Sequence, residues 1–380
     1  MGAFLLHLTD GLAAQGMSVD VVAPHAAGLA EAESIGSARV HRFRYAPARW
    51  ETLAYQGTMH ELVAAGLGRQ VLFAFFNLAF LWQAVRVVFA ARVQVIHAHW
   101  WLPGGFIGAL ASLLTRRPLV ITTHGTDVEM LRRTRWAQPL ARFTFGRARR
   151  VTCGSTYLRE QLVSLGVVDA ARVAVIPMPV NANFRFRSAD LRFKSEIRNL
   201  KSVLTVARLS AQKSIDTLIE AVALLHERGV DARLRVIGEG KKRGALEAQA
   251  AKLGLRDKVE FLGQRPQKEL PRYYGECDIF VLPSIREGMG LVLAEALLCG
   301  APVIAANSGG VTDIVRDGET GLLFPERDAK ALADAIQRMM SDRALAERLA
   351  ATGRAFVSAR FAQERVTGEF IRIYDEAASG

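Results

Sequence analysis

Cysteine is scarce in this chain of 380 residues, and its scarcity excludes two kinds of architecture. The three cysteines, Cys153, Cys277 and Cys299, lie far apart in apolar surroundings. An odd number at these spacings fits neither a disulfide framework nor a structural zinc site. No grouping of His, Asp and Glu has the spacing of metal ligands either. We therefore expect a protein of a reducing compartment, the cytoplasm, with no metal ligands.

We expect no secretory signal, and the sequence has no uncharged apolar run long enough to cross a bilayer. The N-terminus has no basic region, and Leu6 occupies the position where a myristoylation signal has Ser or Thr. The segment nearest to a membrane span is Gln70–Val85, sixteen uncharged residues between Arg69 and Arg86. A span needs about 20 residues. Two interpretations stay open: a segment that lies in the membrane interface, and a buried helix of an α/β domain.

Lysine is absent from residues 1 to 180, where 18 arginines stand against 10 acidic residues and leave a net charge of +8. The whole chain carries +12, so most of the excess lies in this half. A basic face suits nucleic acid, anionic lipid or a phosphorylated substrate, whereas arginines on ordinary solvated faces are the alternative. The aromatic residues that accompany basic ones in nucleic-acid binders are not seen. We expect no nucleic acid as a partner, and an anionic membrane surface as one candidate.

Half of the residues are apolar, which is enough for two hydrophobic cores in a chain of this length. Short β-branched runs alternate with helical stretches, a pattern typical of parallel sheets covered by helices on both faces. We expect five strands in each half, a polar linker from about Pro179 to Asn199, and a ligand at the carboxyl ends of the strands. The expected strands are Val19–Ala23, Val93–Ala98, Leu119–Thr123, Arg150–Cys153, Val173–Ile176, Ser202–Ala207, Arg233–Ile237, Val259–Leu262, Ile279–Leu282 and Pro302–Ala305.

Both ends of the chain are predicted to be helical. Apolar residues from Phe4 to Leu12 recur at helical spacing before the first strand, so the chain opens inside a helix. A doubly wound domain normally opens with a strand at the centre of its sheet. We therefore expect the first strand of the N-terminal domain, with its turn, to be missing from this sequence. The tail from Phe361 to Ala377 should pack as a closing helix.

The most informative segment lies between Pro283 and Gly321. A buried strand ends at Pro283, and Gly288 and Gly290 form a permissive turn into a helix that begins near Leu291. The free N–H groups and the dipole of that helix start make a site for an anion, most simply a phosphate. Two glutamates eight residues apart flank this turn, Glu287 before the helix and Glu295 inside it. At that spacing they would grip different parts of one elongated ligand, such as a nucleotide-sugar.

With these residues in place, the chain resembles the retaining nucleotide-sugar glycosyltransferases of family 4, which have the GT-B fold. The resemblance runs from about Leu5 to the C-terminus. Its strongest element is the E-x7-E signature, matched by Glu287 and Glu295 with the glycines and prolines around them. The resemblance implies that Glu287 orients the sugar and Glu295 the ribose. It also implies contacts from the turn and helix start to the donor, through Gly288, Met289, Gly290, Leu291 and Val292.

A second element of the resemblance follows the strand Ser202–Ala207. Arg208 and Lys213, five residues apart, match the family's pair of cations that stabilise the leaving diphosphate. Ser214 departs from the family's usual glycine, and we expect it to be tolerated if its backbone stays in an ordinary region.

Two glycine turns complete the implied donor site. Gly238 and Gly240 resemble the family's Gly-x-Gly turn beside the nucleotide, and Gln264 follows a strand in what resembles the base-recognition loop. Both turns also have a purely structural interpretation. The turn of Gly238 and Gly240 is not a dinucleotide fingerprint, because the next glycine, Gly244, is misplaced for it.

The N-terminal half holds the implied acceptor loops, His97-Ala98-His99 and His124-Gly125-Thr126-Asp127, both after strands. The resemblance implies that His124 lies beside the transferred sugar. We expect at most one of His97 and His99 to face the ligand.

The resemblance completes the predicted organisation: a GT-B fold of two Rossmann-like, doubly wound domains facing each other across a cleft, with the closing helix. We predict an acceptor-binding domain at residues 1–180, a nucleotide-sugar-binding domain at 181–360, and the helix at 361–380, packing back across both.

The implied activity is a retaining, metal-independent hexosyl transfer from a UDP- or GDP-sugar, without a cofactor. The expected acceptor is a glycan or lipid-linked hydroxyl, in cell-surface glycan, polysaccharide or glycolipid biosynthesis. The expected location is cytoplasmic, with peripheral attachment to the inner face of the cell membrane as a further expectation. Alternatives are a truncated or non-catalytic nucleotide-sugar binder, and a GT-B nucleotide-sugar epimerase.

Overall fold

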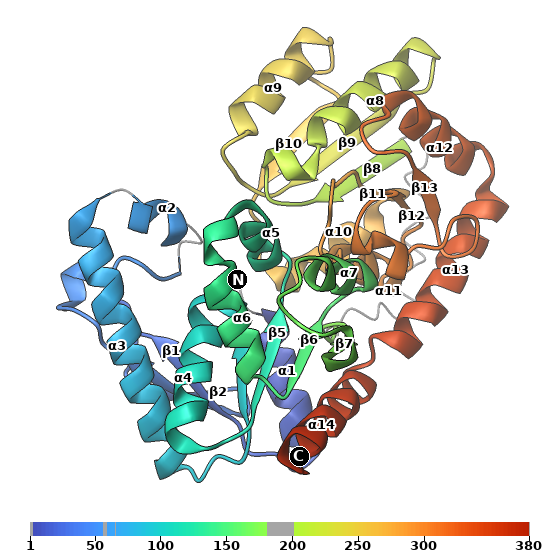
Figure 1. Cartoon of the computed structure of the whole chain (residues 1–380). Coiled ribbons are helices and arrows are strands. Elements are labelled where there is room, and N and C mark those ends of the chain that lie inside the picture. Colours follow the sequence, from blue (N-terminus) through green and yellow to red (C-terminus); the bar gives the residue numbers. More distant parts are fainter. Residues whose placement is uncertain (1–2, 56–58, 65, 181–200, 380) are drawn as a thin grey trace. The chain divides into compact units, whose positions relative to one another are not determined.

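The computed structural model describes residues 3–55, 59–64, 66–180 and 201–379, so nearly all of the predicted linker lies outside the described residues. The chain divides into two compact units (Figure 1). Unit 1 comprises Met1–Pro179 together with Gln363–Gly380, and unit 2 comprises Val180–Ala362. Unit 1 is therefore built from both ends of the chain, and unit 2 is a single insertion between them.

The strands of unit 1 form two separate sheets. One has the order β1-β3-β2, with β1 and β3 parallel and β2 antiparallel; the other is parallel, in the order β4-β5-β6-β7. The prediction of five strands was wrong here, since β2 and β3 were missed. The strands are β1 (Asp20–Pro24), β2 (Ala32–Ile35), β3 (Ala38–Phe43), β4 (Ile96–His99), β5 (Leu119–Thr123), β6 (Arg150–Cys153) and β7 (Val173–Val175).

The helices of unit 1 begin with α1, which precedes β1 as expected for a chain that opens inside a helix. The C-terminal helix α14 packs against α1, where a Cβ added at Gly11 would lie only 2.6 Å from the methyl carbon of Thr367. Glycine at position 11 thus permits this close helix contact. The helices are α1 (Ala3–Ala14), α2 (Met59–Ala64), α3 (Leu67–Ala90), α4 (Phe106–Thr115), α5 (Thr126–Arg133), α6 (Gln138–Arg147), α7 (Thr156–Ser164) and α14 (Gln363–Ser379).

Helix α3 contains the uncharged stretch Gln70–Val85 and extends it at both ends to 24 residues. Its buried residues are Phe76, Val87 and Val88, and most of its other side chains are partly or fully exposed. The interpretation of this stretch as a buried helix was wrong.

Unit 2 is built on one parallel sheet in the order β10-β9-β8-β11-β12-β13. The structure adds β13, a strand of three residues, to the five that the sequence predicted. The strands are β8 (Lys201–Val206), β9 (Ala232–Ile237), β10 (Val259–Gly263), β11 (Ile279–Leu282), β12 (Val303–Ala306) and β13 (Leu322–Phe324).

Helices cover both faces of this sheet and bury two hydrophobic clusters. Neighbouring residues along a strand enter opposite clusters: Val203 and Val281 join one, whereas Leu204 and Phe280 join the other. This alternation explains why β11 and β12 are apolar at every position. The helices are α8 (Ile215–Glu227), α9 (Arg243–Lys252), α10 (Leu270–Glu276), α11 (Leu291–Leu298), α12 (Ala329–Ser341) and α13 (Arg343–Arg360).

Candidate functional site

The sheet of unit 2 has a topological switch point between β8 and β11. The chain runs outward from β8 to β9 and β10, then returns to pair β11 with the other side of β8. The loops after β8 and β11 therefore diverge at the same edge of the sheet, where open α/β folds bind their ligands. The predicted residues Arg208 and Lys213 follow β8, and Glu287 follows β11.

Lys213 and Glu287 form an ion pair across this switch point. Both side chains are mostly covered, with exposed fractions of 17% and 14%. Burial acts to raise the pKa of Glu287, but the charge and the hydrogen bond of Lys213, together with weaker interactions from the Ser284 side chain and the backbone of Gly288, hold that pKa below its usual value. Glu287 is thus a carboxylate at neutral pH, and Lys213 neutralises it.

The loop that carries Glu287 is fixed from two sides by hydrogen bonds. On one side, the N–H of Ile285 donates to the carbonyl of Gln212 at 2.8 Å, and the side-chain amide of Gln212 donates to the carbonyl of Arg286 at 3.1 Å. On the other side, the N–H of Gly310 donates to the carbonyl of Glu287 at 2.7 Å. The loops after β8, β11 and β12 therefore hold the Glu287 backbone in place.

Glycine at position 309 is required by the same close packing. Gly309 has a φ of +67°, and a Cβ built there would lie 2.3 Å from the carbonyl oxygen of Glu287. Gly290, the residue before α11, has a φ of +76°. Gly288 has no positive φ, so the permissive conformation predicted for both glycines of the turn is found at Gly290 alone. The helix α11 then begins at Leu291, as predicted, and includes Val292.

Arg208 lies at the end of β8 with its side chain exposed. It forms no hydrogen bond or ion pair with another residue that the structure describes. The structure therefore pairs Lys213 with the carboxylate of Glu287 and leaves Arg208 as an uncommitted cation. Ser214 corrects the sequence analysis: its φ of +47° and ψ of +40° place it in the left-handed region, where glycine is favoured. Its hydroxyl lies 3.0 Å from that of Thr217.

Glu295 lies on the buried side of α11, with an exposed fraction of 8%. Its carboxylate accepts hydrogen bonds from the hydroxyl of Tyr274 at 3.0 Å and the amide of Gln267 at 3.4 Å. Burial raises the pKa of Glu295 to about 7, although these two hydrogen bonds act to lower it. The two signature glutamates thus have opposite electrostatics: Glu287 is paired and ionised, whereas Glu295 titrates near neutral pH.

The predicted Gly-x-Gly turn, Gly238 to Gly240, follows β9 and lies against the loop after β8. A Cβ at Gly238 would meet the carbonyl oxygen of Ala207 at 1.9 Å, and a Cβ at Gly240 would meet that of Leu209 at 2.2 Å. Close backbone approach is thus a structural reason for both glycines. Gln264 is exposed directly after β10.

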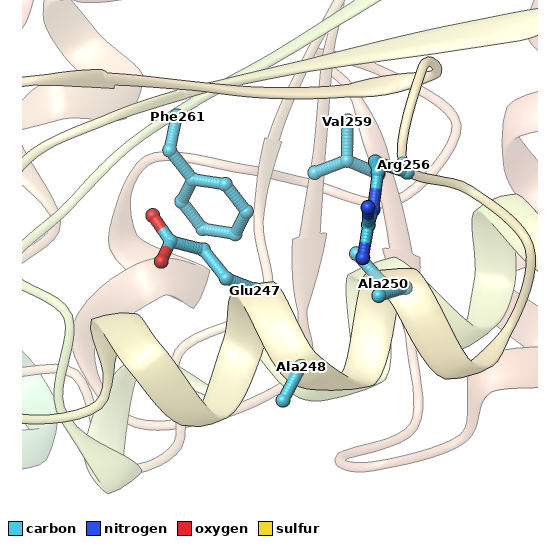
Figure 2. A pocket seen from close by; sticks show the side chains of 7 residues that line it. Glu247, Ala248, Ala250, Arg256, Val259 and Phe261 are labelled. Atoms are coloured by element: carbon cyan, nitrogen blue, oxygen red, sulfur yellow. The ribbon is translucent and has the colours of Figure 1, made fainter.

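A hollow beside α9 is separate from these residues (Figure 2). It lies between α9 and the edge strand β10, lined by residues such as Glu247, Arg256 and Phe261. None of its lining residues belongs to the predicted set. In the described part of the chain, no three His, Cys, Asp or Glu side chains gather in a way that could hold a metal ion.

Unit 1 gathers three histidines at the carboxyl ends of β4 and β5. The Nδ1 of His99 and the Nε2 of His124 are 2.9 Å apart and share a hydrogen bond. The ring centroids of His97 and His99 are 4.4 Å apart, so both side chains lie on the same side of β4. The assumption behind the expectation for this pair, that the two side chains alternate across the strand, was wrong, because residues two apart on a strand point to one face. Burial lowers the pKa of His97 to about 3 and that of His124 to about 4.

Asp127 holds the loops around these histidines and was not singled out by the sequence analysis. Its Oδ1 accepts from the N–H groups of His124 and Gly125, both at 3.0 Å, and its Oδ2 accepts from that of Trp101 at 3.1 Å. Tyr374 of α14 similarly lies 2.8 Å from the Nδ1 of His97. An acidic residue three positions after a strand-end histidine was the available signal for Asp127.

Sequence comparisons identify the family of the chain. Glycosyltransferase Family 4 matches residues 1–184, and Glycosyl transferases group 1 matches residues 188–356. A D-inositol 3-phosphate glycosyltransferase of Actinosynnema mirum is 33% identical over 309 residues, which cover 75% of this chain and 72% of that protein. The chain belongs to glycosyltransferase family 4. This glycosyltransferase is also 30% identical, over 72% of its length and 74% of the relative's, to a GDP-mannose-dependent alpha-(1-6)-phosphatidylinositol monomannoside mannosyltransferase of Mycobacterium tuberculosis.

Solved structures confirm the GT-B fold of the glycosyltransferase. A sucrose-phosphate synthase from Thermosynechococcus elongatus has a TM-score of 0.81 at 26% identity, covering 98% of this chain and 92% of that chain. Anabaena Alr3699/HepE in complex with UDP and glucose has a TM-score of 0.74 at 22% identity, covering 99% and 96%. The roles of individual side chains in this glycosyltransferase remain predictions.

Proposed function

We propose that this glycosyltransferase moves a hexosyl group from a UDP- or GDP-sugar to an acceptor hydroxyl, with retention of the anomeric configuration and without a metal ion. The observation that carries the proposal is the grouping at the switch point of unit 2. An uncommitted Arg208, the ion pair of Lys213 with Glu287, and the N-terminus of α11 all follow the carboxyl ends of β8 and β11. Together they suit a ligand with a diphosphate and a sugar.

In the proposed reaction, the bond between the anomeric carbon and the diphosphate oxygen breaks while the acceptor oxygen bonds to the same face of the sugar. The acceptor's proton passes to the departing phosphate oxygen, so the products are a glycoside and a nucleoside diphosphate. Arg208, Lys213 and the start of α11 stabilise the charge that develops on the leaving group. Because Lys213 already pairs with Glu287, it places a cation between the diphosphate and the carboxylate that orients the sugar.

The remaining roles divide along the donor. Glu295 binds the ribose hydroxyls, and the backbone from Gly288 to Val292, including Met289, cradles the diphosphate. Gly238 and Gly240 bring backbone close to the nucleotide, and Gln264 meets the base edge. His124 is neutral at pH 7, since its pKa is lowered to about 4, so it positions the sugar by hydrogen bonding rather than by charge.

The acceptor is proposed to bind unit 1 and to be a glycan or lipid-linked hydroxyl. One named relative supports a lipid-linked acceptor, because it is described as a phosphatidylinositol monomannoside mannosyltransferase. The relative described as a D-inositol 3-phosphate glycosyltransferase has a soluble acceptor by its name and supports only a hydroxyl acceptor. Structures of Anabaena Alr3699/HepE with UDP and with UDP-glucose support a nucleotide-sugar donor. These relatives favour a place in cell-surface glycan, polysaccharide or glycolipid biosynthesis.

Activity is tested with the purified full chain in two steps. A thermal-shift screen of UDP- and GDP-sugars identifies the donor, which should raise the melting temperature because it binds only the folded protein. Nucleoside diphosphate release is then measured with and without acceptor, and the anomeric configuration of the product is read by NMR. Release that needs no acceptor would contradict transfer, and a product of inverted configuration would contradict retention.

The leaving-group assignment is tested by Arg208→Ala. We expect turnover to fall by about 30- to 1,000-fold, equivalent to about 2–4 kcal/mol of transition-state stabilisation, with a smaller change in KM. Arg233→Ala is the matched control, because Arg233 is also exposed on this sheet but lies near the opposite, amino end of β9. Unchanged turnover in Arg208→Ala would show that this cation does not serve the leaving group.

A further inference from the structure

Helix α3 carries an exposed apolar stripe along its length. Six large apolar side chains are each more than half exposed, and Trp82 reaches 71%. Their spacing of three, four or seven residues puts them on one face of the helix. The α3 face is defined by Leu67, Val71, Phe75, Leu78, Trp82 and Phe89.

The other side of α3 is fixed to unit 1. The ring of Phe76 lies 5.0 Å from that of Phe43, the last residue of β3, and 5.0 Å from that of Tyr45, just after β3. The helix also contacts β1 and α4 (Figure 1). In the described part of the chain, α3 alone is long and apolar enough to cross a membrane, yet these contacts tie it to a folded sheet. Its 24 residues offer a stripe about 36 Å long that lies against a surface rather than through one.

The surroundings of the α3 face carry positive charge without compensation. Between Glu61 and Asp127 the sequence has five arginines and no acidic residue. All five are exposed, and none forms an ion pair with another described residue. They are Arg69 and Arg86 within α3, Arg92 just after it, and Arg116 and Arg117 just after α4.

Helix α4 extends this apolar and basic character beyond α3. It packs beside α3 and exposes Leu113 and Leu114, which only Thr115 separates from Arg116 and Arg117. Exposed leucines next to unpaired arginines are typical of a helix end at a lipid interface, where the apolar side chains enter the acyl boundary and the guanidinium groups meet phosphates.

We infer that the α3 face docks this protein on an anionic membrane surface. The six apolar side chains enter the headgroup boundary, and the arginines around them bind lipid phosphates. Charge decides between a membrane and a second copy of the chain, since two copies joined through α3 would bring ten like charges together. The inference rests on the proposed function in one respect: docking would bring the protein to a lipid-linked acceptor. Vesicle binding tests the docking itself without any transfer reaction.

The apolar part is tested by sedimentation of the full chain with vesicles of phosphatidylglycerol and phosphatidylcholine. Trp82→Ser should lower the partition coefficient by about tenfold, because it removes one inserted aromatic side chain. Trp136→Ser is the matched control, because Trp136 is 82% exposed but lies outside α3 and α4, and it should bind as the parent protein does. Equal binding by both variants and the parent would overturn the inference.

The basic part is tested by the pair Arg116→Gln and Arg117→Gln. Removing two charges should weaken binding by about tenfold at low salt and less at physiological salt. The control pair, Lys330→Gln and Arg338→Gln, removes the same charge from exposed positions on α12 of unit 2 and should change binding little. Equal loss in both pairs would point to net charge rather than to this surface and would contradict the inference.

Two further outcomes would contradict membrane docking through the α3 face. Failure of the parent protein to sediment with anionic vesicles at either salt concentration would end the inference. A concentration-dependent dimer that Trp82→Ser abolishes, without vesicle binding, would assign the face to a second copy. Transfer to a soluble acceptor is measured on the same proteins, and Trp82→Ser should retain this activity. If the parent and every variant lacked transfer activity, that result would count against the proposed function and not against membrane docking.

Discussion

Binding of the nucleotide-sugar should release a proton from Glu295. This carboxylate is buried between α10 and α11, and burial raises its pKa to about 7. Ribose hydroxyls can donate hydrogen bonds to the ionised form, which therefore binds the donor better than the protonated form does. At neutral pH part of the protein must lose this proton before it binds. Donor affinity should accordingly rise with pH.

The size of this effect follows from the pKa. With a pKa of about 7, roughly a tenth of Glu295 is ionised at pH 6 and roughly nine tenths at pH 8. If only the ionised form binds, Kd should fall about tenfold between these values, or about 1.4 kcal/mol. The diphosphate of a nucleotide-sugar does not titrate in this range. His97 and His124 stay neutral there, because their pKa values are about 3 and 4.

Isothermal titration calorimetry at pH 6, 7 and 8 measures both the affinity and the proton released. Repeating each titration in two buffers of different ionisation enthalpy gives the number of protons per donor bound. Glu295→Gln should bind the donor more weakly at pH 8 and lose the dependence on pH. A Kd that does not change with pH, or the same dependence in Glu295→Gln, would refute the reasoning.

Three predictions concern stability, each measured by urea unfolding. Folding raises the pKa of Glu295 from 4.5 to about 7, so its ionisation costs stability progressively as pH rises from about 4.5 to 7. Glu295→Gln should therefore be more stable than the parent by about 3 kcal/mol at pH 8, and as stable as the parent near pH 4.5. Gly309→Ala should destabilise unit 2 by about 2 kcal/mol or more through its clash with the Glu287 carbonyl, whereas Gly244→Ala, in open space in α9, should be neutral or stabilising. Tyr374→Phe should cost unit 1 about 1–2 kcal/mol by leaving a buried histidine nitrogen unpaired, and no loss would contradict that hydrogen bond.

The sequence predicted Ile279–Leu282, whose residues are all apolar, and missed Ala32–Ile35 and Ala38–Phe43, in which charged residues interrupt the apolar ones. Ile279–Leu282 was placed correctly because all four residues are buried between two layers of helices. Ala32–Ile35 is exposed along its whole length, so its composition carries no signal of burial. Leu322–Phe324 has three residues, too few for a periodic pattern.

The candidate site was predictable where chain position fixes geometry. Lys213 and Glu287 were expected to serve one ligand because each follows a strand, and their ion pair shows that the two strands are neighbours. The contact of Tyr274 with Glu295 depends on how α10 packs on α11, which sequence spacing does not specify. The left-handed conformation of Ser214 could have been expected from the glycine that the family usually has there, although the serine itself gives no signal of it.

The insertion of unit 2 within unit 1 has a consequence for synthesis of the chain. Domains generally fold as units while the ribosome still elongates the polypeptide. Unit 2 is complete when residue 362 has emerged, but unit 1, whose translation starts first, awaits α14. Val366 and Phe370 of that helix are fully buried, and Tyr374 nearly so. Unit 1 therefore starts before unit 2 and is finished after it, and a premature stop codon after residue 362 would spare unit 2 and damage the unit whose strands are all translated earlier.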